Sequence, residues 1–187
     1  MNKGMYKAVV FDRDGTLNVT GANEGGYILA PEDVRLLPGA AEAVQRVWAA
    51  GAQVFVFTQQ GCIGKGLLSE AGLEAIHRRF EALLAPSGGV VQFYHCPHTA
   101  EAGCSCRKPA PGMLLQLMRD HGLAPHEVLV IGDHVRDGAA AQAAGMDFAF
   151  VQPEKKTLLQ DKAAYPVVYE NALAAVIAVL GARSSAG

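Results

Sequence analysis

Short apolar runs alternate along the chain with longer segments in which apolar residues recur every three or four positions. The short runs are rich in β-branched and aromatic residues, which is typical of strands buried on both faces of a parallel sheet. They predict strands at residues 6–11, 53–57, 90–94, 128–131, 147–151 and 165–169.

The longer segments have the spacing of helices with one buried face. They predict helices at residues 39–50, 69–84, 112–121, 138–144 and 171–180, with a tail at 181–187. In the second of these helices, Ser69 is placed to cap the first turn and His77 falls on the solvent side. Its buried stripe comprises Leu73, Ile76, Phe80 and Leu83.

Strands and helices that alternate in this way predict a doubly wound α/β fold, Rossmann-like, with a mostly parallel sheet. We expect residues 1–187 to form a single domain. Residues 62–66 predict a glycine-rich turn. Residues 19–38 are a long polar loop that leaves the end of the first strand. Such a loop can fold over a binding crevice, or it can be a solvated connector.

Composition narrows the choice of partners. The chain is 50% hydrophobic and 18% charged, its net charge is −2, and no basic run exceeds two residues. Duplex nucleic acid is therefore not an expected partner, since it requires concentrated Lys and Arg. No secretory signal is visible and no apolar segment is long enough to span a bilayer. We expect a cytoplasmic monomer with no membrane partner.

Two carboxylates, Asp12 and Asp14, follow the first predicted strand and precede Gly15. Ligands of open parallel sheets bind beyond the carboxyl ends of the strands, so both side chains should face a crevice. A divalent cation would relieve their repulsion, and a carboxylate beside a phosphate can attack phosphorus to form an aspartyl-phosphate. The second carboxylate could act as acid and base. The alternative is an ordinary polar turn, where Asp and Gly are common.

Other strand ends carry polar groups of the same kind. The second strand ends in Thr58-Gln59-Gln60, whose hydroxyl and amides can hold phosphate oxygens. The fourth strand is followed by Asp133 and Asp137. Asp133 can reach the same cation as Asp12, and Asp137 can cap the next helix or support the metal site.

Three of the four cysteines lie close together in a loop at residues 95–108. Three sulfurs and one imidazole make a tetrahedral Zn²⁺ set of the structural kind, formed by Cys96, His98, Cys104 and Cys106. The alternative is a chance cluster of reduced cysteines. His95 is a rival ligand, but alternation along the strand points it to the opposite side. Cys62 is interpreted as an ordinary buried thiol.

Two cations, Arg107 and Lys108, end this loop just before the helix at 112–121. A lysine fixed here can neutralise a phosphoryl group, and an arginine can grip a second anionic group as a fork. The alternative is a pair of solvated surface cations.

The order of these groups, Asp12 and Asp14, then Thr58, Lys108 and Asp133, resembles the four motifs of the haloacid dehalogenase superfamily of phosphatases. No stretch is long enough for a large cap domain, so the resemblance implies a capless site. The DRDGTLN stretch, the cysteine–histidine set, Arg107-Lys108-Pro109 and Gly132-Asp133 more narrowly resemble the D-glycero-D-manno-heptose 1,7-bisphosphate phosphatases. The histidinol-phosphate phosphatases are similar. The likeness covers about residues 6–150.

The resemblance implies a Mg²⁺-dependent phosphatase with a structural Zn²⁺. Asp12 would be the nucleophile, Asp14 the acid and base, and Thr58 and Lys108 would stabilise the phosphoryl group. Mg²⁺ would be held by Asp12, the backbone carbonyl of Asp14, and Asp133. Arg107 would recognise the substrate, and the other expected substrate contacts are Asn18, Asn23, Gln59, Gln60 and His134.

The implied substrate is D-glycero-D-manno-heptose 1,7-bisphosphate, which would lose its C7 phosphate. Histidinol phosphate or another small phosphorylated metabolite is an alternative, because the chain departs from the heptose enzymes near the substrate. It has Thr58-Gln59-Gln60-Gly61-Cys62 where they have Thr-Asn-Gln-Ser-Gly, and His134 where they have Lys. A zinc-stabilised pseudo-enzyme that binds a partner without turnover is the alternative from a different class.

Overall fold

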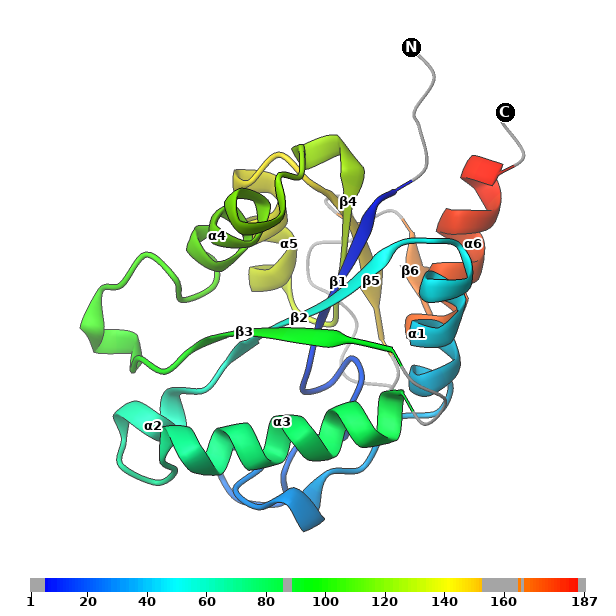
Figure 1. Ribbon diagram of the computed structural model, residues 1–187. Helices are drawn as coiled ribbons and strands as arrows, with labels where there is room; N and C mark the ends of the chain where they lie inside the picture. The colour runs from blue at the N-terminus through cyan, green and yellow to red at the C-terminus, as the bar shows by residue number, and fades with distance from the viewer. Residues whose placement is uncertain (1–5, 86–88, 153–164, 166, 185–187) are drawn as a thin grey trace.

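The structure, a computed structural model, describes residues 6–85, 89–152, 165 and 167–184. Its strands form one parallel sheet in the order β3-β2-β1-β4-β5-β6 (Figure 1). The strands are β1 (Ala8–Asp12), β2 (Gln53–Gln59), β3 (Val91–Cys96), β4 (Val128–Gly132), β5 (Asp147–Val151) and β6 (Val168–Tyr169). The predicted doubly wound α/β class is therefore confirmed.

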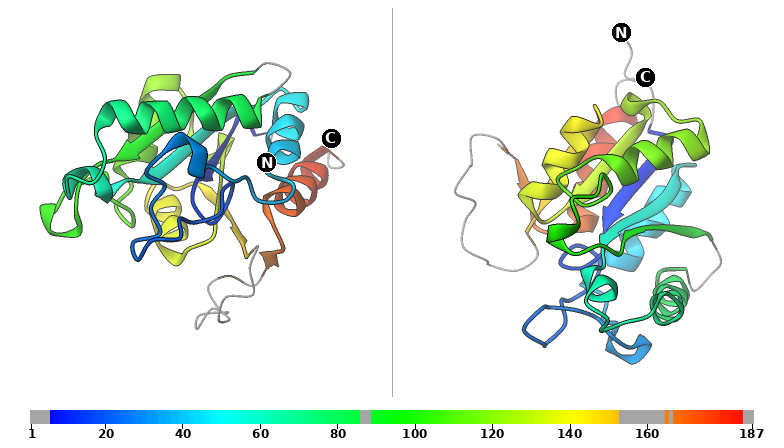
Figure 2. Two further views of the ribbon diagram at one scale, coloured as in Figure 1. Left: turned by 90° about the horizontal axis from the view of Figure 1, so that it is seen from below. Right: turned by 90° about the vertical axis from the view of Figure 1, so that its left-hand side faces the viewer.

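Helices cover both faces of this sheet (Figure 2). One layer contains α1 (Ala40–Ala49), α3 (Glu70–Leu84) and α6 (Ala172–Ser184), and the other contains α4 (Gly112–His121) and α5 (Val135–Ala143). Alternate side chains of β1 pack against opposite helix layers. Val9 and Phe11 lie in the core beneath α1, α3 and α6, while Ala8 and Val10 lie in the core beneath α4 and α5. This double burial explains why β1 is apolar along its length.

The strand ends meet where the sequence predicts the crevice. The register pairs Asp12 with Phe57 of β2 and Phe11 with Ile131 of β4. Thr58 and Gly132 are therefore the next residues on the two strands that flank Asp12. The strand order also reverses between β1 and β4, and ligands of such sheets bind at this switch point.

Several element boundaries differ from the prediction. A short helix, α2 (Gly61–Gly64), replaces the first part of the turn expected at 62–66. β2 and β3 both extend beyond their predicted ends, and α5 begins at Val135 rather than at 138. Within the described residues, β6 is confined to Val168–Tyr169. The loop at 19–38 contains one turn of 3-10 helix, Pro31–Asp33.

The surface of α3 is buried over a wider arc than the sequence indicates. Ser69 caps this helix as predicted, since its Oγ accepts a hydrogen bond from the backbone N–H of Gly72 at 3.1 Å. His77, expected on the solvent side, is instead half-buried, with its ring stacked on Phe93 at a centroid distance of 4.1 Å. Burial, with contributions from Arg13 and His95, lowers the pKa of His77 to about 3. Phe93, on the edge strand β3, covers the histidine.

No helix among the described residues has both the length and the apolar character that crossing a membrane would require.

The last helix continues past its predicted end. The sequence predicts a tail from Gly181, because glycine is a poor helix former, but α6 runs through it to Ser184. Residues of this helix up to Leu180 pack on α1 and the sheet. A Cβ atom at Gly181 would meet no atom within 4 Å.

Gly181→Ala is therefore expected to stabilise the protein by about 0.5–1 kcal/mol, because it removes glycine's backbone entropy from a helix interior. Equilibrium denaturation with urea measures the change. Gly122→Ala is the matched control: its Cβ would also lie in open space, but Gly122 has a φ of 62° as the C-cap of α4. This control should destabilise, and equal gains at the two positions would contradict the argument.

Candidate active site

Lys108 joins two carboxylates at the centre of the site. Its ammonium nitrogen lies 2.5 Å from Asp12 Oδ1 and 2.6 Å from Asp137 Oδ1. The same nitrogen lies 3.9 Å from the centroid of the Phe57 ring, and all three charged side chains are buried. They come from β1, the segment before α4, and the first turn of α5. The fold therefore brings together charges that are distant in sequence.

Asp133 completes a group of three carboxylates with Asp12 and Asp137, whose ligand oxygens all lie within 4.8 Å of one another. Two glycines allow this close approach. A Cβ atom at Gly15 would collide with the carboxylate of Asp133, and one at Gly132 would lie 2.7 Å from the side chain of Asp137. The glycine that follows the predicted carboxylate pair thus makes room for a third carboxylate.

Among the described residues, this group sets one ammonium, which contacts Asp12 and Asp137, against three carboxylates. Burial raises the pKa of Asp12 to about 8; Asp137 and Asp133 add to the shift and Lys108 opposes it. Burial would lower the pKa of Lys108, but Asp12 and Asp137 outweigh it, so the pKa is raised and the ammonium form is kept. A divalent cation would balance the excess, and Mg²⁺ prefers oxygen ligands of this kind. The residues present therefore fit such an ion.

Asp14 is held apart from this group. Arg13 Nε lies 3.1 Å from each of its carboxylate oxygens, and Arg13 Nη2 lies 2.8 Å from Asp14 Oδ2. Gln60 Nε2 donates to the same Oδ2 at 3.2 Å and to Thr58 Oγ1 at 2.8 Å. The side chain of Asp14 is thus turned toward Arg13 and Gln60. Any contact of this residue with a cation in the three-carboxylate group would come through its backbone carbonyl, as the resemblance implies.

The predicted substrate residues fall in different places. Gln59 Nε2 donates to the backbone carbonyl of Lys108 at 2.6 Å, so this amide anchors the lysine segment. Gln60 and Thr58 are buried beside Asp14. His134 is exposed at the start of α5, where its Nδ1 accepts from the backbone N–H of Arg136 at 3.2 Å. Arg107 Nη1 donates to the carbonyl of His98 at 3.0 Å, across the cysteine loop.

Two predicted substrate contacts, Asn18 and Asn23, are used inside the loop at 19–38 instead. Asn18 is fully buried; its Oδ1 accepts from the backbone N–H of Arg35 at 2.7 Å and its Nδ2 donates to the carbonyl of Val19 at 2.6 Å. Asn23 donates to and accepts from the backbone of Tyr27, at 2.7 and 2.9 Å. Both amides satisfy polar backbone in a segment without regular structure. Asn23 is also exposed and lines a pocket beside this loop, and the substrate role of both residues stays a prediction.

The predicted cysteine–histidine set comes together in space. His98 Nδ1 lies 3.2 Å from Cys106 Sγ and 3.6 Å from Cys96 Sγ, and the sulfur–sulfur distances are 3.3–3.6 Å. A tetrahedron with metal–sulfur bonds of about 2.3 Å has edges only slightly longer than these. Cys104 completes the set, whose ligand atoms all lie within 4.8 Å of one another. This donor set fits a tetrahedral divalent ion.

The two neighbouring candidates behave as predicted. His95 lies outside the set and its Nε2 is 2.9 Å from Glu70 Oε2. Cys62 is a buried thiol that donates to Gln60 Oε1 at 3.6 Å, and burial raises its pKa.

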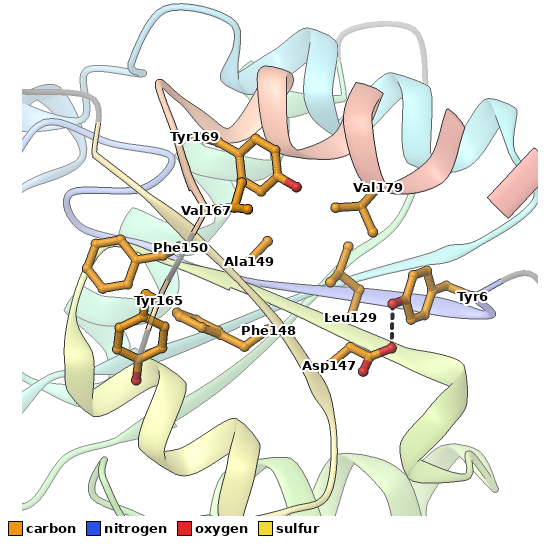
Figure 3. A pocket seen from close by; sticks show the side chains of 10 residues that line it. All are labelled: Tyr6, Leu129, Asp147, Phe148, Ala149, Phe150, Tyr165, Val167, Tyr169 and Val179. Atoms are coloured by element: carbon orange, nitrogen blue, oxygen red, sulfur yellow. Dashed lines mark hydrogen bonds between the residues drawn. The ribbon is translucent and has the colours of Figure 1, made fainter. Parts of the chain in front are cut away.

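The structure also has pockets outside the charged group. One, of about 340 Å³, lies at β5 and β6 and is lined mainly by aromatic and apolar side chains (Figure 3). At its rim, Tyr6 donates a hydrogen bond to Asp147 Oδ2 at 2.6 Å. A second pocket, of about 560 Å³, lies between the 19–38 loop and the segment after α2, where Lys65 Nζ is 5.5 Å from the Tyr27 ring centroid. The long loop therefore forms a wall of a cavity.

Comparison with known proteins identifies the family. The HAD-hydrolase-like family matches residues 105–176. The D-glycero-β-D-manno-heptose-1,7-bisphosphate 7-phosphatase of Bordetella bronchiseptica is 36% identical over 157 residues, which cover 82% of this chain and 86% of that protein. This chain belongs to the haloacid dehalogenase-like phosphatases.

Further members of this family give the same assignment. The enzyme of the same name from Pseudomonas putida is 37% identical, and the matched region covers 80% of this chain and 84% of that protein. A crystal structure of the B. bronchiseptica D,D-heptose 1,7-bisphosphate phosphatase, complexed with magnesium and phosphate, matches with a TM-score of 0.80 and 31% identity. The match covers 94% of this chain and 99% of that chain. The recognised group, the heptose bisphosphate phosphatases, is thus confirmed.

The excess negative charge predicts an unusual effect of Asp12→Asn on stability. Burial, with Asp137 and Asp133, raises the pKa of Asp12 from 3.8 to about 8, so its charged carboxylate costs the folded state free energy that the unfolded chain does not lose. The resulting penalty is absent below about pH 4 and grows as the pH rises toward 8. In metal-free protein at pH 8, Asp12→Asn should therefore stabilise by about 1 kcal/mol, which raises Tm by about 2–4 °C.

Thermal unfolding in EDTA at pH 4 and pH 8 measures this effect, and the gain should appear only at pH 8. Mg²⁺ should stabilise the wild type more than the variant, because the variant lacks one ligand charge. A wild type that is more stable than Asp12→Asn at pH 8 without metal would contradict the charge balance.

Proposed function

We propose that this protein is a phosphoric monoester hydrolase that removes the C7 phosphate of D-glycero-D-manno-heptose 1,7-bisphosphate through an aspartyl-phosphate on Asp12. The observation that carries the proposal is the group formed by the buried Asp12 and Lys108 and the half-buried Asp133 beside Asp14, in a chain whose relatives bear this activity in their names.

Each residue has a role that its surroundings support. Asp12 attacks phosphorus as the ester bond to the sugar oxygen breaks, and Lys108 neutralises the phosphoryl oxygens. Asp14 gives its proton to the leaving sugar oxygen. Asp14 then takes a proton from water, which attacks phosphorus and releases Asp12 and inorganic phosphate. Thr58 is linked to Asp14 by Gln60, whose side-chain amide donates hydrogen bonds to both. In this site Thr58 holds a phosphoryl oxygen.

Mg²⁺ would be held by Asp12, Asp133 and the backbone carbonyl of Asp14. When bound, it would offset the negative charge of the carboxylates and of the phosphoryl group. Asp137, which is almost fully buried and bonded to Lys108 and to the backbone N–H of His134, supports the group from behind.

Recognition of the sugar falls to groups outside the phosphoryl site. Arg107 is half-buried beside Gly61, and its guanidinium can reach an anionic or hydroxyl group distant from Asp12. Of the other predicted contacts, His134 is exposed just beyond the end of β4, whereas Gln60 is buried between Asp14 and Thr58. We infer that the substrate is a small phosphorylated metabolite, and that the protein acts as a single-domain monomer in the cytoplasm.

A phosphate-release assay with Mg²⁺ tests the proposed substrate. The panel contains the α and β anomers of the heptose bisphosphate, the corresponding 1-phosphate, and histidinol phosphate. Both anomers are included because one relative is named for the β anomer and another for the α anomer. We expect the bisphosphate to have the highest kcat/KM and the 1-phosphate to remain as product. Asp12→Asn should lower turnover at least about 10³-fold, as expected when a nucleophile is removed.

A higher kcat/KM for histidinol phosphate would assign the alternative substrate. Stoichiometric binding of the bisphosphate without phosphate release from any compound in the panel would favour the pseudo-enzyme.

We further propose that Cys96, His98, Cys104 and Cys106 hold a structural Zn²⁺. The loop that carries them leads directly into Arg107 and Lys108, and Arg107 is bonded to the carbonyl of His98. Loss of the ion should therefore loosen both cations as well as the loop.

Elemental analysis is expected to give close to one Zn²⁺ per chain, and Cys104→Ser should reduce that content and lower Tm. Cys62→Ser is the matched control, since Cys62 lies outside the set, and it should retain the zinc. A fully stable and fully active protein without zinc would reject the proposal.

A further inference from the structure

Arg13 occupies a position that is costly for a charged side chain. It is fully buried and its guanidinium carbon lies 5.2 Å from the ring centroid of Phe80, in the apolar layer beneath α3. Its Nη1 has no hydrogen-bond partner among the described residues. A buried ion pair rarely adds stability over an apolar replacement, because desolvation offsets the attraction. Stability alone therefore does not account for a guanidinium at this position.

Arg13 fixes the side chain of Asp14. Its Nε and Nη2 form a planar fork on the carboxylate of Asp14, with three contacts of 2.8–3.1 Å. Because the guanidinium is rigid and packed against Phe80, the fork restrains both the position and the plane of that carboxylate. Asp14 itself is partly exposed, with 20% of its side-chain surface accessible.

Gln60 adds a second restraint from the other flank. Its Nε2 donates to Asp14 Oδ2 and to Thr58 Oγ1, while its Oε1 accepts from the Cys62 thiol. The amide is almost fully buried, so its orientation is fixed. The carboxylate of Asp14 is thus held between a buried fork and a buried amide.

We propose that Arg13, assisted by Gln60, is a positioning residue that aims Asp14 at the leaving-group oxygen. The inference rests on the proposed function, since it takes Asp14 as the general acid. Arg13 acts behind Asp14 and does not touch the substrate. Its removal should therefore slow the step in which Asp14 delivers a proton and leave substrate binding unchanged.

The chemistry offers a selective test. When the ester bond of a sugar phosphate breaks, the leaving alkoxide needs a proton from Asp14 as the Asp12–phosphorus bond forms. A dinitrophenolate leaving group is stable as an anion and needs none. Mispositioning of Asp14 should consequently slow the first reaction far more than the second.

The experiment measures first-step rates by rapid quench with the sugar phosphate and by stopped flow with 2,4-dinitrophenyl phosphate. Arg13→Met should slow cleavage of the sugar phosphate by about 10–100-fold, part of the range typical of general acid catalysis, with KM unchanged. Release of dinitrophenolate should change by less than about threefold. Arg13→Lys should lie between wild type and Arg13→Met, because it keeps the charge and loses the fork.

Leu84→Ala is the matched control. Leu84 is fully buried at the end of α3 in the same apolar layer, so this change should lower Tm and alter both rates alike. If the Arg13 variants do not fold, Gln60→Met removes the second restraint and should show a smaller loss with the same selectivity.

Equal slowing of the two substrates, a change in KM alone, or no change would overturn the role of Arg13. The proposed substrate is judged separately, on the wild type. If the wild type prefers another alkyl phosphate, that compound replaces the sugar phosphate in the same comparison. If it cleaves neither class of ester, both proposals fail.

Discussion

Compensation of charge at the end of β1 is the constraint on which the site depends. Asp12 and Asp137 are buried and Asp133 beside them is half-buried, so the mutual repulsion of the three carboxylates is only partly screened. Lys108 offsets part of it by contacting two of the three carboxylates. The side chain of Asp14 is turned away from these three, toward Arg13 on the core side. The remaining excess suits a divalent cation and a reaction in which phosphoryl oxygens must be stabilised.

The cysteine loop is connected to this charge balance through the backbone. Gln59, at the end of β2, donates to the carbonyl of Lys108, and the backbone N–H of Gly112 donates to the carbonyl of Ser105 at 3.0 Å. Gly112 also lacks the Cβ atom that would collide with Ser105, so α4 can begin directly against the loop. Lys108 is thereby fixed at the strand edge by one side chain and by the start of a helix. A metal in the loop would make that segment more rigid still.

The sequence predicted the features that depend on local pattern. Apolar runs and helical spacing located the sheet and the helices, and α4 and β5 have the predicted bounds, because burial of one face leaves a periodic trace. The cysteine spacing located the metal set for a similar reason. Features that depend on a distant partner were missed. Asn18 bonds to Arg35, and Gln59 to Lys108, through contacts that nothing in their own neighbourhood indicates.

Arg13 is the clearest example of a site residue that sequence reasoning missed, although its place in the sequence contains a signal for its position. It stands between two carboxylates at the end of a buried strand, and alternation along that strand turns it toward the core side with Phe11.

The two cations of the site, Lys108 and Arg13, are not interchangeable. Lysine is a compact charge that can be shared between Asp12 and Asp137 and still serve a phosphoryl group, whereas arginine holds one carboxylate in one plane. A nucleophile must exchange partners during the reaction, while an acid must stay aimed. The chain places each cation where that difference is useful.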